Sequence, residues 1–194
     1  MTQPSLFSAD LLPPAQLDLG GLLAAHGQMV GGPQGSRISI LLTDAWRADS
    51  LIRECAARDL IAETVRDRTD GAVLLRTERS AKLDALTTRW TRGAVKAPPP
   101  DLVIDAGLLR IWLLAAGRPD AQGYLLGLDP HAAGMHSALA AALARAGLAG
   151  SVTGVQSGWP AVRLTGRRRA ARLAEMIGDP PSGAPDGIWP VPGR

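Results

Sequence analysis

Arginine is the residue type in this chain whose chemistry and placement point most directly to a function. Only Lys82 and Lys96 are lysines among the 21 lysine and arginine residues. A guanidinium group makes paired, planar hydrogen bonds to phosphate and to guanine, whereas an ammonium group is a point charge. The arginines therefore favour a nucleic-acid partner. A GC-rich genome gives the same bias, and a formal charge of +3 with a pI near 9.7 does not separate the two explanations.

Alternation along the predicted strands assigns many polar side chains to one exposed sheet face. Strands are predicted over 36–42, 61–68, 72–77, 123–128, 151–156 and 159–165, with an Asp70-Gly71 turn in the first hairpin. If Val65 and the other apolar strand residues face the core, the intervening side chains face outward. The predicted DNA-contacting residues are Arg37, Ser39, Thr64, Arg66, Arg68, Arg76, Thr153, Gln156 and Arg163. The alternative is an ordinary solvated sheet face, which also carries polar side chains.

Four further basic residues are predicted to contact phosphate. Arg92 and Lys96 lie in a proline-rich segment, and Arg167 and Arg168 begin the last predicted helix. Positive side chains at a helix N-terminus oppose the helix dipole, which favours an anionic neighbour there. The alternative for Arg167 and Arg168 is a solvated start to the helix.

Other kinds of site lack the residues that they need. His26, His131 and His136 have no ligand spacing with acidic residues or cysteine, so no metal site and no cofactor are predicted. The single cysteine, Cys55, fits a small buried residue in a reducing compartment, and the five tryptophans are expected to pack in cores or under loops. We recognise no signal peptide and no apolar run of membrane-spanning length, and therefore expect a cytoplasmic protein.

An apolar helix signature that occurs twice indicates how the strands are arranged. The copies are Leu19–Met29 and Leu109–Gly117, and the elements around each follow the order α-β-β-α-β-β-α. Such duplication predicts an α+β fold of two pseudo-symmetric units. The expected organisation is a flexible leader at 1–14, a first unit at 15–90, a proline-rich extended linker at 91–101, a second unit at 102–178 and an irregular tail at 179–194.

Residues 19–27 resemble the nine-residue motif of LAGLIDADG homing endonucleases. The matching positions are Leu19, Gly21, Leu22, Ala25 and Gly27 in the first copy and Leu109, Ala115 and Gly117 in the second. The resemblance implies two motif helices in contact through Gly21, Ala25, Ile111 and Ala115. It also implies four strands per unit, which form a saddle-shaped antiparallel sheet on the major groove of double-stranded DNA. In that family an acidic residue before each final glycine binds divalent metal for phosphodiester hydrolysis.

The chain departs from the family at this acidic position. His26 precedes the final glycine of the first copy, and Ala116 precedes that of the second. Alanine cannot ligate a metal, and a lone histidine is a poor ligand for Mg²⁺, so nuclease activity is expected to be absent. The sequence is similar to the degenerate N-terminal LAGLIDADG-like domain of WhiA-type regulators, but we recognise no helix-turn-helix after Ile177.

The sequence thus predicts a catalytically inactive, monomeric protein that binds double-stranded DNA, with transcription control as its expected role. One alternative is a protein–protein interaction or scaffold module on the same fold. Another is a residual metal-dependent endonuclease whose acids have moved to Asp44, Asp120 or Asp129. Asp44 and Asp129 are better explained as N-caps of helices.

Overall fold

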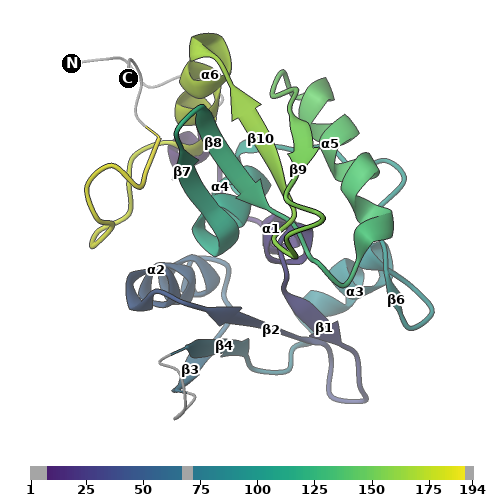
Figure 1. Cartoon of the computed structure of the whole chain (residues 1–194). Coiled ribbons are helices and arrows are strands. Elements are labelled where there is room, and N and C mark those ends of the chain that lie inside the picture. The colour runs from purple at the N-terminus through teal and green to yellow at the C-terminus, as the bar shows by residue number, and fades with distance from the viewer. Residues whose placement is uncertain (1–7, 67–71, 191–194) are drawn as a thin grey trace.

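The computed structural model describes residues 8–66 and 72–190, which fold into two units of the same element order (Figure 1). The first unit contains α1 (Gly20–Ala24), β1 (Gln28–Val30), β2 (Arg37–Leu42), α2 (Ala45–Ala56), β3 (Ala62–Arg66), β4 (Val73–Thr77) and α3 (Asp84–Trp90). The second contains α4 (Ala106–Ala116), β7 (Gly117–Asp120), β8 (Gly123–Gly127), α5 (His136–Arg145), β9 (Ser151–Thr153), β10 (Ala161–Thr165) and α6 (Arg167–Ile177). Single 3-10 turns lie at η1 (Ala9–Leu11), η2 (Gln16–Leu19), η3 (Ala81–Leu83) and η4 (Ala133–Met135).

Each unit has a four-stranded antiparallel sheet with the same strand order. The orders are β1-β2-β4-β3 and β7-β8-β10-β9, so strands that are equivalent in sequence occupy equivalent places. This arrangement confirms the α+β fold and the α-β-β-α-β-β-α order of each unit, although the sequence pattern locates only three of the four strands in each unit. The described strands of the two units form separate hydrogen-bonded sheets rather than one continuous ladder.

The sequence pattern does not predict β1 or β7, although both follow the final glycine of a motif copy. β7 contains Pro119, and proline lacks the N–H that a residue in a central strand donates to its neighbour. β7 lies at the edge of its sheet, where a missing N–H is tolerated. The first copy of the helix signature does not form one continuous helix, because this segment divides into η2 and the five-residue α1.

The two motif helices, α1 and α4, pack against each other at the centre of the molecule (Figure 1). A Cβ atom on Gly21 would lie 2.9 Å from the Cβ of Ile111. Gly21 and Ile111 are the third residues of the two motif copies, so the pseudo-two-fold axis passes between them. Ala25 and Ala115 are buried as well. Small side chains at these positions set the short separation between the two helices.

The segment between the units differs from the extended linker that its prolines predict. β5 (Thr91–Arg92) pairs with β6 (Val95–Lys96) in a small hairpin. Gly93 has a φ of +63°, a conformation that glycine adopts without a steric penalty, and the chain reverses there. The three prolines follow this hairpin instead of stiffening the whole segment.

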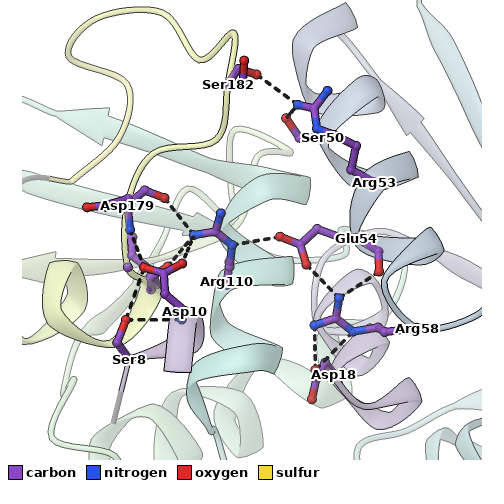
Figure 2. A network of polar contacts seen from close by, with 12 residues as sticks. Ser8, Asp10, Asp18, Ser50, Arg53, Glu54, Arg58, Arg110, Asp179 and Ser182 are labelled. Atoms are coloured by element: carbon purple, nitrogen blue, oxygen red, sulfur yellow. Dashed lines mark hydrogen bonds and ion pairs between the residues drawn. The ribbon is translucent and has the colours of Figure 1, made fainter. Parts of the chain in front are cut away.

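A network of charged side chains joins the two units (Figure 2). The Glu54 carboxylate of α2 accepts hydrogen bonds from Arg58 at 2.7 Å and from Arg110 of α4 at 2.8 Å. Arg58, which is only 4% exposed, also lies 2.6 Å from the Asp18 carboxylate. Burial alone would raise the pKa of Glu54, but the two arginines lower it overall.

The segments before α1 and after α6 pack against the same network. The Asp10 carboxylate accepts the Asp179 N–H at 2.9 Å, so the described part of the leader contacts the segment after α6. Residues 178–190 contain no helix or strand, as expected, but Trp189 is buried and donates to the Gly178 carbonyl. A cavity of about 380 Å³ beside Arg110 is lined by side chains of this network.

Two predicted helix caps have other partners in the structure. Asp44 precedes α2 but makes no side-chain cap, because its carboxylate pairs with Arg47 at 3.0 Å. Asp129 lies well before α5, which begins at His136, and it accepts the His131 N–H at 2.9 Å. Both carboxylates form ion pairs near the C-terminal ends of the motif helices, Asp44 with Arg47 and Asp129 with Lys96.

Two further expectations concern single features of the chain. Cys55 is fully buried, and this burial raises the pKa of its thiol to about 11. None of the helices in the described ranges is long and apolar enough to cross a membrane.

Candidate nucleic-acid interface

Each sheet packs one face against the core. The opposite face is largely open on the first sheet, but on the second sheet it includes the buried residues Leu125 and Ala161. In β2 the side chains of Ile38, Ile40 and Leu42 are buried, whereas the alternating residues Arg37, Ser39 and Leu41 are wholly or partly exposed. We call the open side of each sheet its outer face. Residues that pair directly across antiparallel strands share a face, so the register extends this assignment to every strand.

On the first sheet the outer face carries Arg37, Ser39 and Arg76, as alternation predicts. Arg76 pairs with Ser39 across β2 and β4, and with Glu63 across β3 and β4. Its guanidinium donates to the Glu63 carboxylate at 2.7 Å. The charge of Arg76 is thus partly neutralised. The guanidinium of Arg37, by contrast, has no hydrogen bond or ion pair with a described residue.

The rest of this outer face is more apolar than we expect for a surface that binds DNA through arginine side chains. Val30, Leu41 and Val65 are 52%, 48% and 43% exposed. Pairing places Val30 beside Arg37 and Leu41 beside Leu74, with Val65 next in the same row. The first sheet therefore presents aliphatic side chains around a few polar ones.

The prediction for β3 is wrong, because its apolar residue does not face the core. Val65 lies on the outer face, and the register places Thr64 opposite Leu75 and Arg66 opposite Val73, both buried. The register position of Thr64 is therefore on the same side as buried Leu75, although Thr64 itself is exposed at the edge of the sheet, and the register position of Arg66 is on that side as well. β3 is an edge strand, so an apolar residue there need not be buried. Arg68, also predicted to contact DNA, lies outside the described residues.

On the second sheet the outer face is more basic. Arg163 of β10 is opposite Leu125, and Leu125 is opposite Arg118 of β7. The Nε of Arg163 lies 3.0 Å from the Oδ2 of Asp120. Arg118 is exposed, and its guanidinium has no hydrogen bond or ion pair with a described residue. Sequence reasoning missed Arg118 because it did not recognise β7.

Of the two predicted residues near the β9–β10 turn, the strand register assigns Thr153 to the outer face of the second sheet. Thr153 is opposite Ala161, two residues from Arg163 and therefore on the same face. Gln156 is exposed in the turn. Trp159 in the same turn is 70% exposed, contrary to the expectation that the tryptophans pack inside, whereas Trp90 and Trp112 are fully buried.

The acid positions of the motif lie at the C-terminal ends of α1 and α4. The His26 Nε2 lies 2.7 Å from the Leu41 carbonyl of β2. The Ala116 side chain lies against Gly127 of β8, so the two residues touch the sheets of their own units. Both are partly exposed.

A lysine and an arginine contact the backbone at these same helix ends. Lys96 donates to the carbonyls of Ala25 at 3.1 Å and Gly27 at 2.8 Å, and it lies 2.6 Å from the Asp129 carboxylate. The Lys96 side chain is only 11% exposed and faces these groups, whereas the sequence predicts a phosphate contact. Burial lowers the pKa of Lys96, although Asp129 opposes this effect.

Arg47 makes the corresponding contacts with α4. It donates to the carbonyls of Leu113 at 3.1 Å, Leu114 at 2.8 Å and Gly117, and it pairs with Asp44. Arg47 stacks on the Trp46 ring at 4.6 Å and is mostly buried. Sequence reasoning had no signal for this role, because the contacts join residues more than sixty positions apart.

The other predicted phosphate contacts are separate from the sheet faces. Arg92 is exposed and donates to the neighbouring Thr91 carbonyl. Arg167 and Arg168 line an open cavity of about 680 Å³ at the start of α6, together with Arg169 and Arg172. They are exposed, which also fits the alternative of a solvated helix start.

The carboxylates considered for a relocated nuclease site are all paired with cations. Asp44 pairs with Arg47, Asp120 with Arg163, and Asp129 with Lys96. Within residues 8–66 and 72–190, no three histidine, cysteine, aspartate or glutamate side chains gather as a metal site requires.

Comparison with known proteins identifies the fold. The sequence matches no family model and no curated protein sequence. The homing endonuclease I-WcaI, solved bound to its DNA recognition sequence, is similar with a TM-score of 0.59 and 13% identity, over 88% of this chain and 84% of that chain. The N-terminal LAGLIDADG domain of DUF199/WhiA is similar with a TM-score of 0.57 and 12% identity, over 84% of this chain and 82% of that chain. The chain therefore has the LAGLIDADG homing-endonuclease fold.

Proposed function

We propose that this protein binds double-stranded DNA through the outer faces of its two sheets and does not cleave it. The proposal rests on the pair of related sheets. The outer face of each sheet holds an arginine whose guanidinium has no hydrogen bond or ion pair with a described residue. These residues are Arg37 on the first sheet and Arg118 on the second. A guanidinium without an internal partner is available for phosphate or for a base edge. The similar endonuclease, which was solved with DNA, supports the choice of partner.

The residues at the helix ends support binding without hydrolysis. His26 and Ala116 occupy the positions from which the family's acidic residues act, and Asp44, Asp120 and Asp129 are already paired with basic side chains. Binding without cleavage suits a regulator of transcription, and we propose that role. Selection of bound fragments from random duplexes would identify the target sequence and its genomic context.

The DNA-binding proposal is tested by the salt dependence of duplex affinity. Each phosphate contact contributes about 0.9 to the slope of log affinity against log salt. Replacing Arg37 and Arg118 together by glutamine is expected to lower that slope by about 2 and to leave thermal stability unchanged. The matched control replaces Arg89 and Arg172, which are paired with Asp101 and Glu175, and removes the same charge.

Two outcomes would contradict this proposal. Equal losses of affinity in both double variants would show that only net charge matters, and the sheet faces would then not be the interface. Cleavage of plasmid DNA in the presence of Mg²⁺ or Mn²⁺ would contradict the absence of catalysis.

A protein-binding role is the second candidate, and the first sheet favours it. Val30, Leu41 and Val65 expose aliphatic surface on the face that DNA would occupy. Apolar surface of this kind marks contacts with other proteins more often than contacts with phosphate. Duplex binding that is undetectable even at low salt would favour this candidate over the first.

A further inference from the structure

The two ends of the motif helices do not fit the divalent metal that the fold family implies. Hard divalent cations need several oxygen ligands, of which carboxylates are the strongest. His26 and Ala116 supply none, and the nearby Asp129 carboxylate is already in contact with an ammonium group at 2.6 Å. The backbone oxygens at these ends also have cationic partners, which a metal would have to displace.

We infer that Lys96 and Arg47 are resident cations that take the place of metal at the two helix ends and clamp the two units together. The C-terminal carbonyls of a helix carry partial negative charge, so a cation is favourable there. Lys96 satisfies the carbonyls at the end of α1, and Arg47 satisfies those at the end of α4.

The pseudo-symmetry of the contacts argues that the two cations are equivalent. Gly27 and Gly117 are the final glycines of the two nine-residue motifs, and each presents its carbonyl to one of the cations. The two cations come from unrelated places in the sequence, since Arg47 begins α2 and Lys96 ends the β5–β6 hairpin. Different residues thus meet the same electrostatic requirement in both units.

The clamp is reciprocal between the units. Arg47 of the first unit binds the helix of the second, and Asp44 holds it from the same turn of α2. Asp129 of the second unit holds Lys96 on the helix of the first, and Gln28 of β1 donates to the same carboxylate at 3.0 Å. Each unit therefore stabilises the end of the other unit's motif helix.

The first test measures thermal unfolding of the full chain with and without 5 mM MgCl₂ or MnCl₂, which is roughly the excess needed to detect a millimolar site. NaCl at matched ionic strength is the control. No shift beyond the control is expected for the natural sequence. A divalent-specific rise in unfolding temperature would overturn the inference, because a metal would then bind the folded state in spite of the clamp.

The second test uses Lys96→Met, with Lys82→Met as the control. Lys82 is half exposed, and its Nζ lies as far as 3.7 Å from the carboxylate of its partner Asp59. Lys96→Met is expected to unfold at lower denaturant concentration, and divalent ions are expected to restore part of the loss through the freed Asp129. Equal stability of the two variants would refute the clamp. If Lys96→Met does not fold, Lys96→Met with Asp129→Asn removes both charges and is expected to recover folded protein.

The consequence for DNA rests on the proposed function and can be separated from it. Duplex binding is expected not to require Mg²⁺, so affinity in EDTA should be at least as high as affinity in Mg²⁺ at the same ionic strength, because Mg²⁺ itself competes for the DNA phosphates. A strict requirement for Mg²⁺ would contradict the resident cations. Absence of duplex binding in both buffers would refute the proposed function, while the unfolding experiments would still decide on the clamp.

Discussion

Gly21 of α1 lies directly against the backbone of α4 at Leu108, so a side chain at position 21 would collide with the Leu108 carbonyl oxygen. Ile111 and Trp112 close the same contact from the next turn of α4. This approach brings the two motif helices together and places their C-terminal ends beside both sheets.

Gly21→Val is therefore expected to destabilise the protein by about 1–3 kcal/mol or more, the usual cost of overpacking a filled core. Urea unfolding measures this loss. Gly134→Ala is the control, because a Cβ at Gly134 has no atom within 4 Å and should leave stability nearly unchanged. Equal stability of the two variants would show that α1 and α4 are not in close contact.

The buried Arg58 is expected to be essential to stability. It joins Asp18 and Glu54 at 2.6 and 2.7 Å. Arg58→Met leaves the buried Asp18 carboxylate without its cation and Glu54 with Arg110 alone, and it should cost about 3–5 kcal/mol, as is typical when one partner of a buried pair is removed. Arg172→Met, on the exposed side of α6, should change stability by less than about 0.5 kcal/mol in the same urea experiment.

Glu54 makes the stability of the protein sensitive to acid. Its pKa in the folded state is lowered by Arg110 and Arg58 against the effect of burial, so its contribution is present above its ordinary pKa and is lost as pH falls through the folded-state value. Glu54→Gln is therefore expected to flatten the decline in stability between about pH 5 and pH 3. Unfolding curves at successive pH values would test this, and an unchanged decline would exclude Glu54 as a cause.

Cys55 is expected to be inert in the folded protein. Burial raises the pKa of its thiol to about 11, and its side chain has no access to solvent. A thiol reagent at pH 8 should react only after denaturant is added, and reaction in native buffer would mean that α2 opens readily. Cys55→Ala should lower stability modestly, because it leaves a small cavity.

Much of the fold could be predicted from the local alternation of apolar and polar residues and from the internal repeat. Alternation in β2, β4 and β10 gives the correct buried faces, and the basic start and apolar face of α6 match its observed bounds, Arg167–Ile177. The repeat then predicts the second unit from the first, because equivalent elements must pack equivalently.

The errors arise where non-local contacts decide the structure. Val65 is β-branched and apolar, but it lies on an edge strand whose orientation is set by pairing with β4. β7 is only four residues long and includes Pro119, so its strand state depends on β8. Both errors affect which arginine positions are assigned to the outer face: the register position of Arg66 is on the other side of the sheet, and Arg118 was missed.

The cationic clamp could not have been found from sequence. Lys96 reaches Gly27 across 69 positions, and Arg47 reaches Gly117 across 70. Neither lysine nor arginine has a spacing rule for binding carbonyl oxygens, unlike the residues of a metal motif. Only the packing of α1 on α4 brings these groups together.

The outer faces of the two sheets are unlike, although the strands beneath them correspond. One exposes Val30, Leu41 and Val65, and the other exposes Arg118 with Arg163 beside it. A dimer of identical subunits would present the same surface twice, whereas these two units present different ones. If both sheets contact one duplex, as we propose, we expect its two half-sites to differ in sequence.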